Sequence, residues 1–116
     1  MQTTTYKQTP IGLIPTDWEV KKLGEITEKI GDGLHGTPIY ADNTEYYFVN
    51  GNNLKNGIIN INEETSKVDL TEFKKHKKEL NINSILLSIN GTIGSLAIYQ
   101  NEQIVLGKSV AYINCK

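Results

Sequence analysis

Apolar residues along this chain gather in short runs. Polar turns that are rich in glycine or asparagine separate these runs. The runs are two to five residues long and rich in β-branched and aromatic side chains, as is typical of strands. They lie at residues 45–49, 58–61, 85–89, 96–99 and 105–113, the last interrupted by Gly107-Lys108-Ser109. This pattern predicts a protein built mainly of strands.

A short helical turn is predicted around residues 22–25. Apolar side chains recur at spacings of three or four from Val20 to Ile30, and the triplet Gly31-Asp32-Gly33 ends the strand expected to follow. Residues 31–38 hold three glycines and a proline. We therefore expect an irregular loop there, with several positions free to take a positive φ.

A longer helix is predicted over residues 71–80. Asp69 or Thr71 can cap its amino end, and lysines fill its later turns, where the helix dipole favours them. Phe73 and Leu80 are expected on one face of this helix.

Two interpretations of the run Lys74-Lys75-His76-Lys77-Lys78 stay open. It is either a solvated helix face or a helix that contacts phosphates. Asp69, Glu72 and Glu79 dilute its positive charge, which favours the solvated face.

Residues 90–94, Asn-Gly-Thr-Ile-Gly, form a hinge between two of the predicted strands. Asn-Gly between such runs is the strongest short-range signal for a β-hairpin. Asn90 and Thr92 add a carboxamide and a hydroxyl, which can reach a polar partner such as the edge of a DNA base. The hinge is therefore either a plain turn or a turn that also contacts a ligand.

Length and element pattern together predict one domain. A chain of 116 residues is large enough for a single core. We expect an α+β, strand-dominated single domain, mostly antiparallel, with one or two short helices. Residues 1–10, polar and rich in threonine, are expected to form a flexible arm, which leaves residues 11–116 for the domain.

All 12 basic residues are lysines, and the formal net charge is −1. This charge argues against a strongly basic protein that coats DNA independently of sequence. A specific DNA site would have to read bases with lysine, asparagine, serine or threonine rather than with arginine. The asparagine-rich turn at residues 50–53 fits turn chemistry first, but asparagine also pairs naturally with adenine.

Little in the sequence fits catalysis or metal binding. The single cysteine, Cys115, cannot form an intrachain disulfide, and His35 and His76 lack metal-ligand spacing. Residues 31–36 lack the lysine of a P-loop and the dinucleotide fingerprint. No apolar run approaches the ~20 residues of a membrane helix, and residues 1–7 lack the apolar core of a signal peptide. We expect a cytoplasmic protein that binds neither metal nor membrane.

Five motifs keep a common order and spacing across residues 11–113. They are Ile14-Pro15 with Trp18-Glu19 and Leu23-Gly24-Glu25-Ile26; Asp32-Gly33, His35, Thr37-Pro38 and Tyr40; the segment 47–57; the segment 84–98; and Gly107-Lys108-Ser109-Val110. With these motifs in this order and at this spacing, the chain resembles the amino-terminal target recognition domain of type I restriction-modification specificity subunits. The Gly-Asp pair usual before the family's Ile-Leu strand is Asn83-Ser84 here. Because no segment has the heptads of the helix that joins such domains, the chain resembles the first part of one recognition domain.

This resemblance implies a module without an active site that reads one half of a split sequence in double-stranded DNA. Methyl transfer from S-adenosylmethionine and ATP-driven cleavage would belong to partner methyltransferase and restriction subunits, so no cofactor is expected on this chain. Pairing with a second recognition domain is a further option. No catalytic residue and no metal ligand is expected.

The loops and lysines supply the residues that we expect near DNA. The candidates for reading bases are His35, Thr37, Asn90 and Thr92. The candidates for contacting phosphates are Lys55, Lys74, Lys75, Lys77, Lys78 and Lys108.

Two other functions stay open. The chain could be a protein-interaction fragment that binds a methylation or restriction subunit, or another copy, without reading DNA. It could also be a small enzyme with its site in the glycine loop, but the sequence offers neither a nucleophile motif nor metal ligands for that role.

Overall fold

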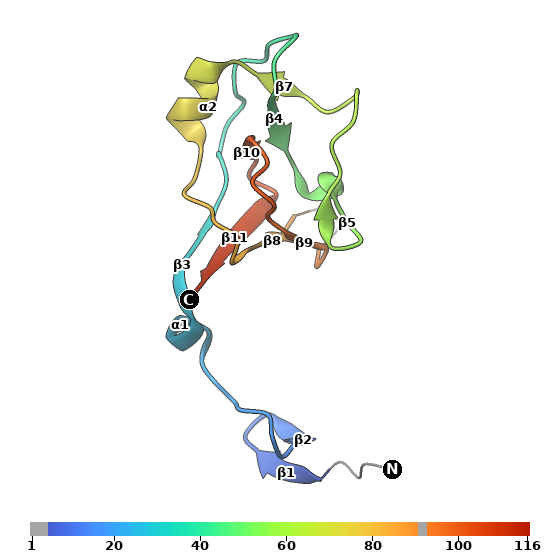
Figure 1. The fold of residues 1–116 in the computed structure, drawn as a ribbon, viewed down its shortest axis with the longest axis vertical. Helices are drawn as coiled ribbons and strands as arrows, with labels where there is room; N and C mark the ends of the chain where they lie inside the picture. The colour runs from blue at the N-terminus through green and yellow to red at the C-terminus, as the bar shows by residue number, and fades with distance from the viewer. Residues whose placement is uncertain (1–4, 91–92) are drawn as a thin grey trace.

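The computed structural model describes residues 5–90 and 93–116 (Figure 1). Its strands are β1 Tyr6–Thr9, β2 Gly12–Pro15, β3 Thr27–Asp32, β4 Tyr46–Val49, β5 Leu54–Lys55, β6 Ile58–Ile59, β7 Lys67–Val68, β8 Ser84–Ser88, β9 Leu96–Ile98, β10 Ile104–Leu106 and β11 Val110–Cys115. Its helices are α1 Leu23–Ile26, α2 Leu70–His76 and the 3-10 turn η1 Gly51–Asn53. The predicted α+β class, dominated by antiparallel strands, is confirmed.

Four antiparallel strands form the main sheet, in the order β3-β11-β8-β9. Buried and half-buried residues alternate along β8 and β11, because successive side chains of a strand point to opposite faces. The predicted hairpin is confirmed, since Ile85 of β8 pairs with Ile98 of β9 on either side of the hinge.

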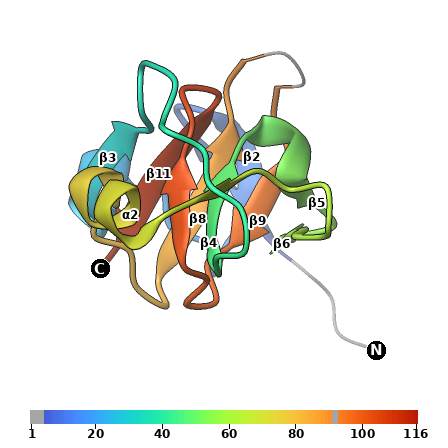
Figure 2. The same ribbon diagram turned by 90° about the horizontal axis from the view of Figure 1, so that it is seen from above.

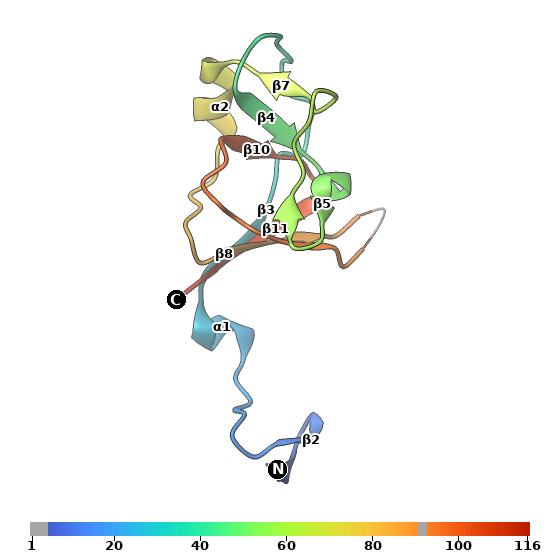
Figure 3. The same cartoon turned by 45° about the vertical axis from the view of Figure 1, so that its right-hand side comes forward.

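A smaller sheet in the order β10-β4-β7 lies over the main sheet (Figure 3). Strand β10 runs parallel to β4, and β7 runs antiparallel to β4. The core fills the space between the sheets: Val49 and Leu106 of the smaller sheet cluster with Leu86 and Tyr112 of the main sheet. Two stacked sheets therefore form the scaffold.

The strand predicted over residues 105–113 is in fact two strands in two sheets. Strand β10 pairs with β4, whereas β11 lies inside the main sheet. Gly107, Lys108 and Ser109 make the turn between them, with Val110 N donating to Gly107 O at 3.1 Å. Both strands border the same core, so the sequence on either side of the turn is equally apolar and reads as one strand.

Helix α2 begins as predicted but ends early. Asp69 is the residue that caps it, because Asp69 Oδ1 accepts a hydrogen bond from Glu72 N at 2.8 Å. The chain is already extended at Lys77, with φ −61° and ψ 145°. The prediction of a helix to residue 80 was therefore wrong.

The early end of α2 has a tertiary cause. Leu80 packs against the main core, whereas Phe73 packs in a second cluster with Val68 and Val105. The prediction that Phe73 and Leu80 share one helix face was therefore wrong. A helix continued to residue 80 would also bring Lys74 and Lys78 one turn apart, where like charges repel.

Residues 6–9, within the segment 1–10 that was expected to form a flexible arm, form strand β1, which pairs with β2. Pro10 and Ile11 make the turn between them. Gly12, the first residue of β2, has a φ of 120°, and Thr9 Oγ1 donates to Gly12 O at 2.6 Å. The hairpin lies apart from the two sheets, at one end of a molecule that measures 55 × 28 × 25 Å (Figure 1). Its residues face no core, so their composition carries no signal for a strand.

Seen from above, α2 and β3 lie at one end of the body and the β5–β6 hairpin at the other (Figure 2). The turn of that hairpin has positive φ at Asn56 (55°) and Gly57 (80°), as a two-residue type I′ hairpin requires. Asn-Gly is a residue pair that this turn type favours. In the part of the chain that the structure describes, no helix is long and apolar enough to cross a membrane.

The outer face of the main sheet carries a row of isoleucines in register. Ile30, Ile113, Ile85 and Ile98 are successive cross-strand partners along β3, β11, β8 and β9. Ile30 and Ile98 are 49% and 55% exposed. The main sheet is therefore apolar on both faces.

Candidate nucleic-acid interface

Three loops that are distant in sequence meet beside the core. They are the loop at residues 33–40 after β3, the turn 50–53 after β4, and the turn 107–109 before β11. Backbone hydrogen bonds join them: Leu34 N donates to Leu106 O at 2.7 Å, and Gly107 N donates to Val49 O at 2.8 Å. The scaffold therefore holds all three loops by their backbones.

Two glycines permit this close approach. A Cβ atom on Gly33 would overlap the backbone of Leu106 and Gly107. A Cβ atom on Gly107 would overlap the carboxamide oxygen of Asn50. Neither glycine has a positive φ, so packing rather than backbone conformation excludes a side chain at both positions.

Side-chain hydrogen bonds join the second and third loops. Ser109 Oγ donates to Asn50 Oδ1 at 3.2 Å and accepts from Gly51 N at 2.8 Å. Asn53 Oδ1 in turn accepts from Asn50 N at 3.0 Å. Asn50 is half-buried, and its carboxamide is held at the point where the loops meet.

An open cleft of ≈ 380 Å³ lies where the three loops meet. Its lining consists of His35, Gly36, Thr37, Tyr40, Phe48, Asn50 and Lys108. A second, mainly polar cleft of ≈ 260 Å³ shares Phe48 and Asn50 with the first. The lining thus combines hydrogen-bonding groups, a lysine and two aromatic rings, which together can contact base edges and a phosphate.

The cleft brings together three of the predicted residues, His35, Thr37 and Lys108. Two contacts involve its lining. His35 Nε2 lies 2.6 Å from Asp32 Oδ2, and the side chains of His35 and Asp32 are 68% and 45% exposed. The rings of Tyr40 and Phe48 meet edge to face, with centroids 6.1 Å apart. Tyr40 was not among the predicted site residues, although it stands in the same motif as His35 and Thr37.

Comparison with known proteins identifies the family. The family of type I restriction modification DNA specificity domains matches residues 15–116. The chain belongs to this family. A relative of this specificity domain, from Methanocaldococcus jannaschii, carries the name type I restriction enzyme MjaX specificity subunit. It is 34% identical over 100 residues, which cover 84% of this chain and 23% of the relative. The chain thus spans about a quarter of the length of that protein.

Asn90 of the specificity domain lies beside the cleft rather than in its lining. Ile89 N donates to Ser109 O at 2.9 Å, which ties the start of the hinge to the turn that carries Lys108. Asn90 follows directly and is exposed. Thr92, the other polar residue predicted in the hinge, lies outside the described residues.

Lys55 is not part of the cleft. It lines a separate depression together with Gly57, Gly94 and Leu96, between the β5–β6 hairpin and the far side of the hinge. Its side chain is exposed. Of the predicted lysines, only Lys108 therefore lines the cleft.

The four lysines near α2 do not share one helix. Lys74 and Lys75 lie in the last turn of α2 and are exposed, whereas Lys77 and Lys78 follow its end. Lys77 Nζ lies 5.7 Å from the centre of the Phe73 ring, a cation–π contact. The structure therefore divides the predicted lysine face into a helical pair and an extended pair.

Within residues 5–90 and 93–116, no group of three or more histidine, cysteine, aspartate or glutamate side chains is placed to hold a metal ion. His35 and His76 each face one carboxylate, Asp32 and Glu72 respectively. The chemistry that the cleft offers is hydrogen bonding and charge.

Proposed function

We propose that this specificity domain binds double-stranded DNA and reads one half of a bipartite target sequence. The observation that carries the proposal is the convergence of His35, Thr37, Asn50 and Lys108 on one open cleft of a domain in this family. Base reading needs a few polar side chains that a rigid scaffold presents. Three loops joined by backbone hydrogen bonds meet that need.

Within this proposal, the residues divide into two roles. Those that read bases are His35, Thr37, Asn90 and Thr92, and the cleft adds Asn50, whose carboxamide suits adenine. Those that contact phosphates are Lys55, Lys74, Lys75, Lys77, Lys78 and Lys108. Each good base contact contributes ~1–3 kcal/mol of discrimination against the wrong base.

The domain directs chemistry that other subunits perform. It is non-catalytic, and it holds the methyltransferase and restriction subunits of the same system on the DNA that it reads. S-adenosylmethionine and ATP are used by those subunits. The other half of the target is read by a second recognition domain, and the assembly acts in the cytoplasm, where the DNA is.

Selection from a pool of duplexes with randomised central positions tests the proposal. We expect one enriched sequence, and its affinity should fall with salt by about 0.9 log units per log unit of salt for each phosphate contacted. Thr37→Val should lower the preference for that sequence, whereas Thr71→Val, an exposed control on α2, should leave it unchanged. A wild-type chain that enriches no sequence would contradict DNA reading.

A second candidate function is contact with another protein of the system. The row of Ile30, Ile113, Ile85 and Ile98 on the outer face of the main sheet favours it, because large exposed apolar patches mark interaction surfaces. The double variant Ile30→Lys, Ile98→Lys should then lose binding to the methyltransferase subunit while its DNA preference stays unchanged. Retained binding to that subunit would contradict this second role.

A further inference from the structure

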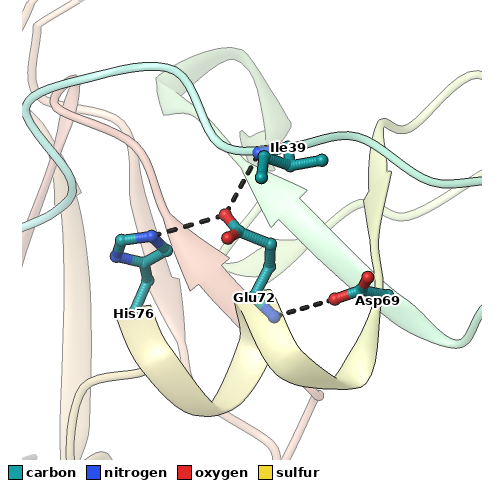
Figure 4. Close-up of polar contacts among 4 residues, drawn as sticks. All are labelled: Ile39, Asp69, Glu72 and His76. Carbon is teal, nitrogen blue, oxygen red and sulfur yellow. Dashed lines mark hydrogen bonds and ion pairs between the residues drawn. The ribbon is translucent and has the colours of Figure 1, made fainter.

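A buried side chain of α2 holds the loop that carries His35 and Thr37. The backbone N–H of Ile39 donates to Glu72 Oε2 at 3.1 Å (Figure 4). Pro38 has no N–H, so Ile39 is the first backbone donor after Thr37. Glu72 therefore ties the loop to α2 two residues beyond a predicted base reader.

Glu72 gives up a local partner to make this contact. It occupies the third position of α2, where a capping-box glutamate would accept from the N–H of the residue that caps the helix. Asp69 does accept from Glu72 N, but the Glu72 carboxylate points toward Ile39 and His76 instead of back to Asp69 (Figure 4). The sequence Asp69-x-x-Glu72 thus has the spacing of a capping box, while its glutamate reaches 33 residues away.

The surroundings of Glu72 fix its direction. Glu72 is only 6% exposed, and a buried carboxylate needs partners to offset its lost hydration. The Ile39 N–H supplies one partner, and His76 Nε2 supplies another at 3.4 Å from the same oxygen. A carboxylate oxygen held by two partners is a firm anchor for a loop that is exposed at Gly36, Thr37 and Ile39 and buried at Pro38.

We infer that Glu72 is a positioning residue for sequence recognition, because it fixes the position of the loop that presents His35 and Thr37 at the cleft. The inference rests on the proposed function. A functional group must be held to about 0.5 Å to keep a productive contact, so a loop released at Ile39 loses the placement of its base readers. Contacts made by the lysines near α2 do not depend on that loop.

The test separates sequence preference from general affinity. Glu72→Met fills the same buried space with a good helix former but offers Ile39 no acceptor. Glu72→Gln keeps a carbonyl oxygen for that N–H. Glu79→Met removes one negative charge from an exposed site and is the control for net charge. Each variant is titrated with the duplex selected by the wild-type chain and with a scrambled duplex, after its melting temperature confirms that it folds.

For Glu72→Met we expect the preference for the selected duplex to fall by about tenfold, the size of one lost base contact. Its affinity for the scrambled duplex should match that of Glu79→Met, and both Glu72→Gln and Glu79→Met should keep the wild-type preference. Equal loss on both duplexes, or no loss on either, would overturn the positioning role alone. If the wild-type chain itself has no preferred duplex, the proposed function fails and the inference fails with it.

Discussion

Ser109 Oγ donates a hydrogen bond to Asn50 Oδ1 at 3.2 Å, across 59 positions of sequence. The same hydroxyl oxygen accepts from Gly51 N at 2.8 Å, so one serine joins the turn after β10 to the turn after β4. These bonds hold the Asn50 carboxamide at the boundary between the two clefts. The orientation of the carboxamide is thus a tertiary property rather than a local one.

Ser109→Ala should destabilise the fold by about 1–3 kcal/mol, because it leaves the half-buried Asn50 and the buried Gly51 N–H without their partner. Unfolding by urea, followed by circular dichroism, measures the change. Ser66→Ala, at an exposed serine on the rim of the second cleft, should be close to neutral. Equal stability of both variants would show that the hydroxyl does not hold the turns together.

Gly33→Ala should destabilise the fold by about 1–3 kcal/mol or more, because the added methyl group overlaps the backbone of Leu106 and Gly107. Gly36→Ala, three residues along the same loop, is the matched control, since its added Cβ would meet nothing within 4 Å. It should be neutral, or stabilising by up to about 1 kcal/mol through the unfolded chain. Thermal unfolding of the two variants compares them directly, and a tolerated Gly33→Ala would contradict the close approach of the loops.

Elements with a local signal were predictable from sequence. Strands β8 and β9 pair on either side of the predicted hinge, and the β5–β6 hairpin turns at Asn56-Gly57, because the signals for both hairpins lie in nearby residues. The end of α2 was not predictable in this way. Lysines are good helix formers, and the packing of Leu80 against the main core, which the sequence does not show, favours an end of the helix before Lys77.

The candidate site shows the same difference between local signals, which the sequence carries, and long-range contacts, which it does not. His35, Thr37 and Lys108 were predicted from the order of motifs, and the structure brings them into one cleft. Tyr40 was missed because its contact in the cleft is with the ring of Phe48, which lies on strand β4. Glu72 was read only as a charge that dilutes the lysine run, since its partner Ile39 is 33 residues away. Contacts of that range leave no periodic pattern in a single sequence.

Asp69→Ala should cost about 1 kcal/mol of stability, because it removes the acceptor for Glu72 N at the start of α2. Asp42→Ala, at an exposed aspartate outside any helix, is the control for charge and should be nearly neutral. Urea unfolding of both variants measures the difference. If Asp69→Ala is equally neutral, the residue that caps α2 contributes nothing measurable to its stability.

Alkaline pH should weaken the fold through Tyr99. Burial, and then the nearby Glu102 carboxylate, raise the pKa of the Tyr99 phenol above its ordinary 10.0, and its hydroxyl donates to Glu102 O at 2.8 Å. The folded chain therefore favours the neutral phenol, and this contribution is complete below pH 10.0 and is lost as the pH rises through the raised pKa. Urea unfolding across this range should show a smaller alkaline loss for Tyr99→Phe than for the wild-type chain. Tyr6→Phe, at an exposed tyrosine, should behave like the wild type.

The exposed pair Lys74 and Lys75 should contribute affinity without sequence preference. If both contact phosphates, the double variant Lys74→Ala, Lys75→Ala weakens binding to selected and scrambled duplexes alike and lowers the slope of log affinity against log salt by about 0.9 for each lysine. Lys7→Ala, on the β1–β2 hairpin, is the control and should keep the wild-type slope. Titrations at several salt concentrations measure both slopes. An unchanged slope for the double variant would mean that these lysines only form a solvated helix face, as Asp69, Glu72 and Glu79 favour in the sequence. Phosphate contact would then rest on the other proposed lysines, of which Lys108 lines the cleft.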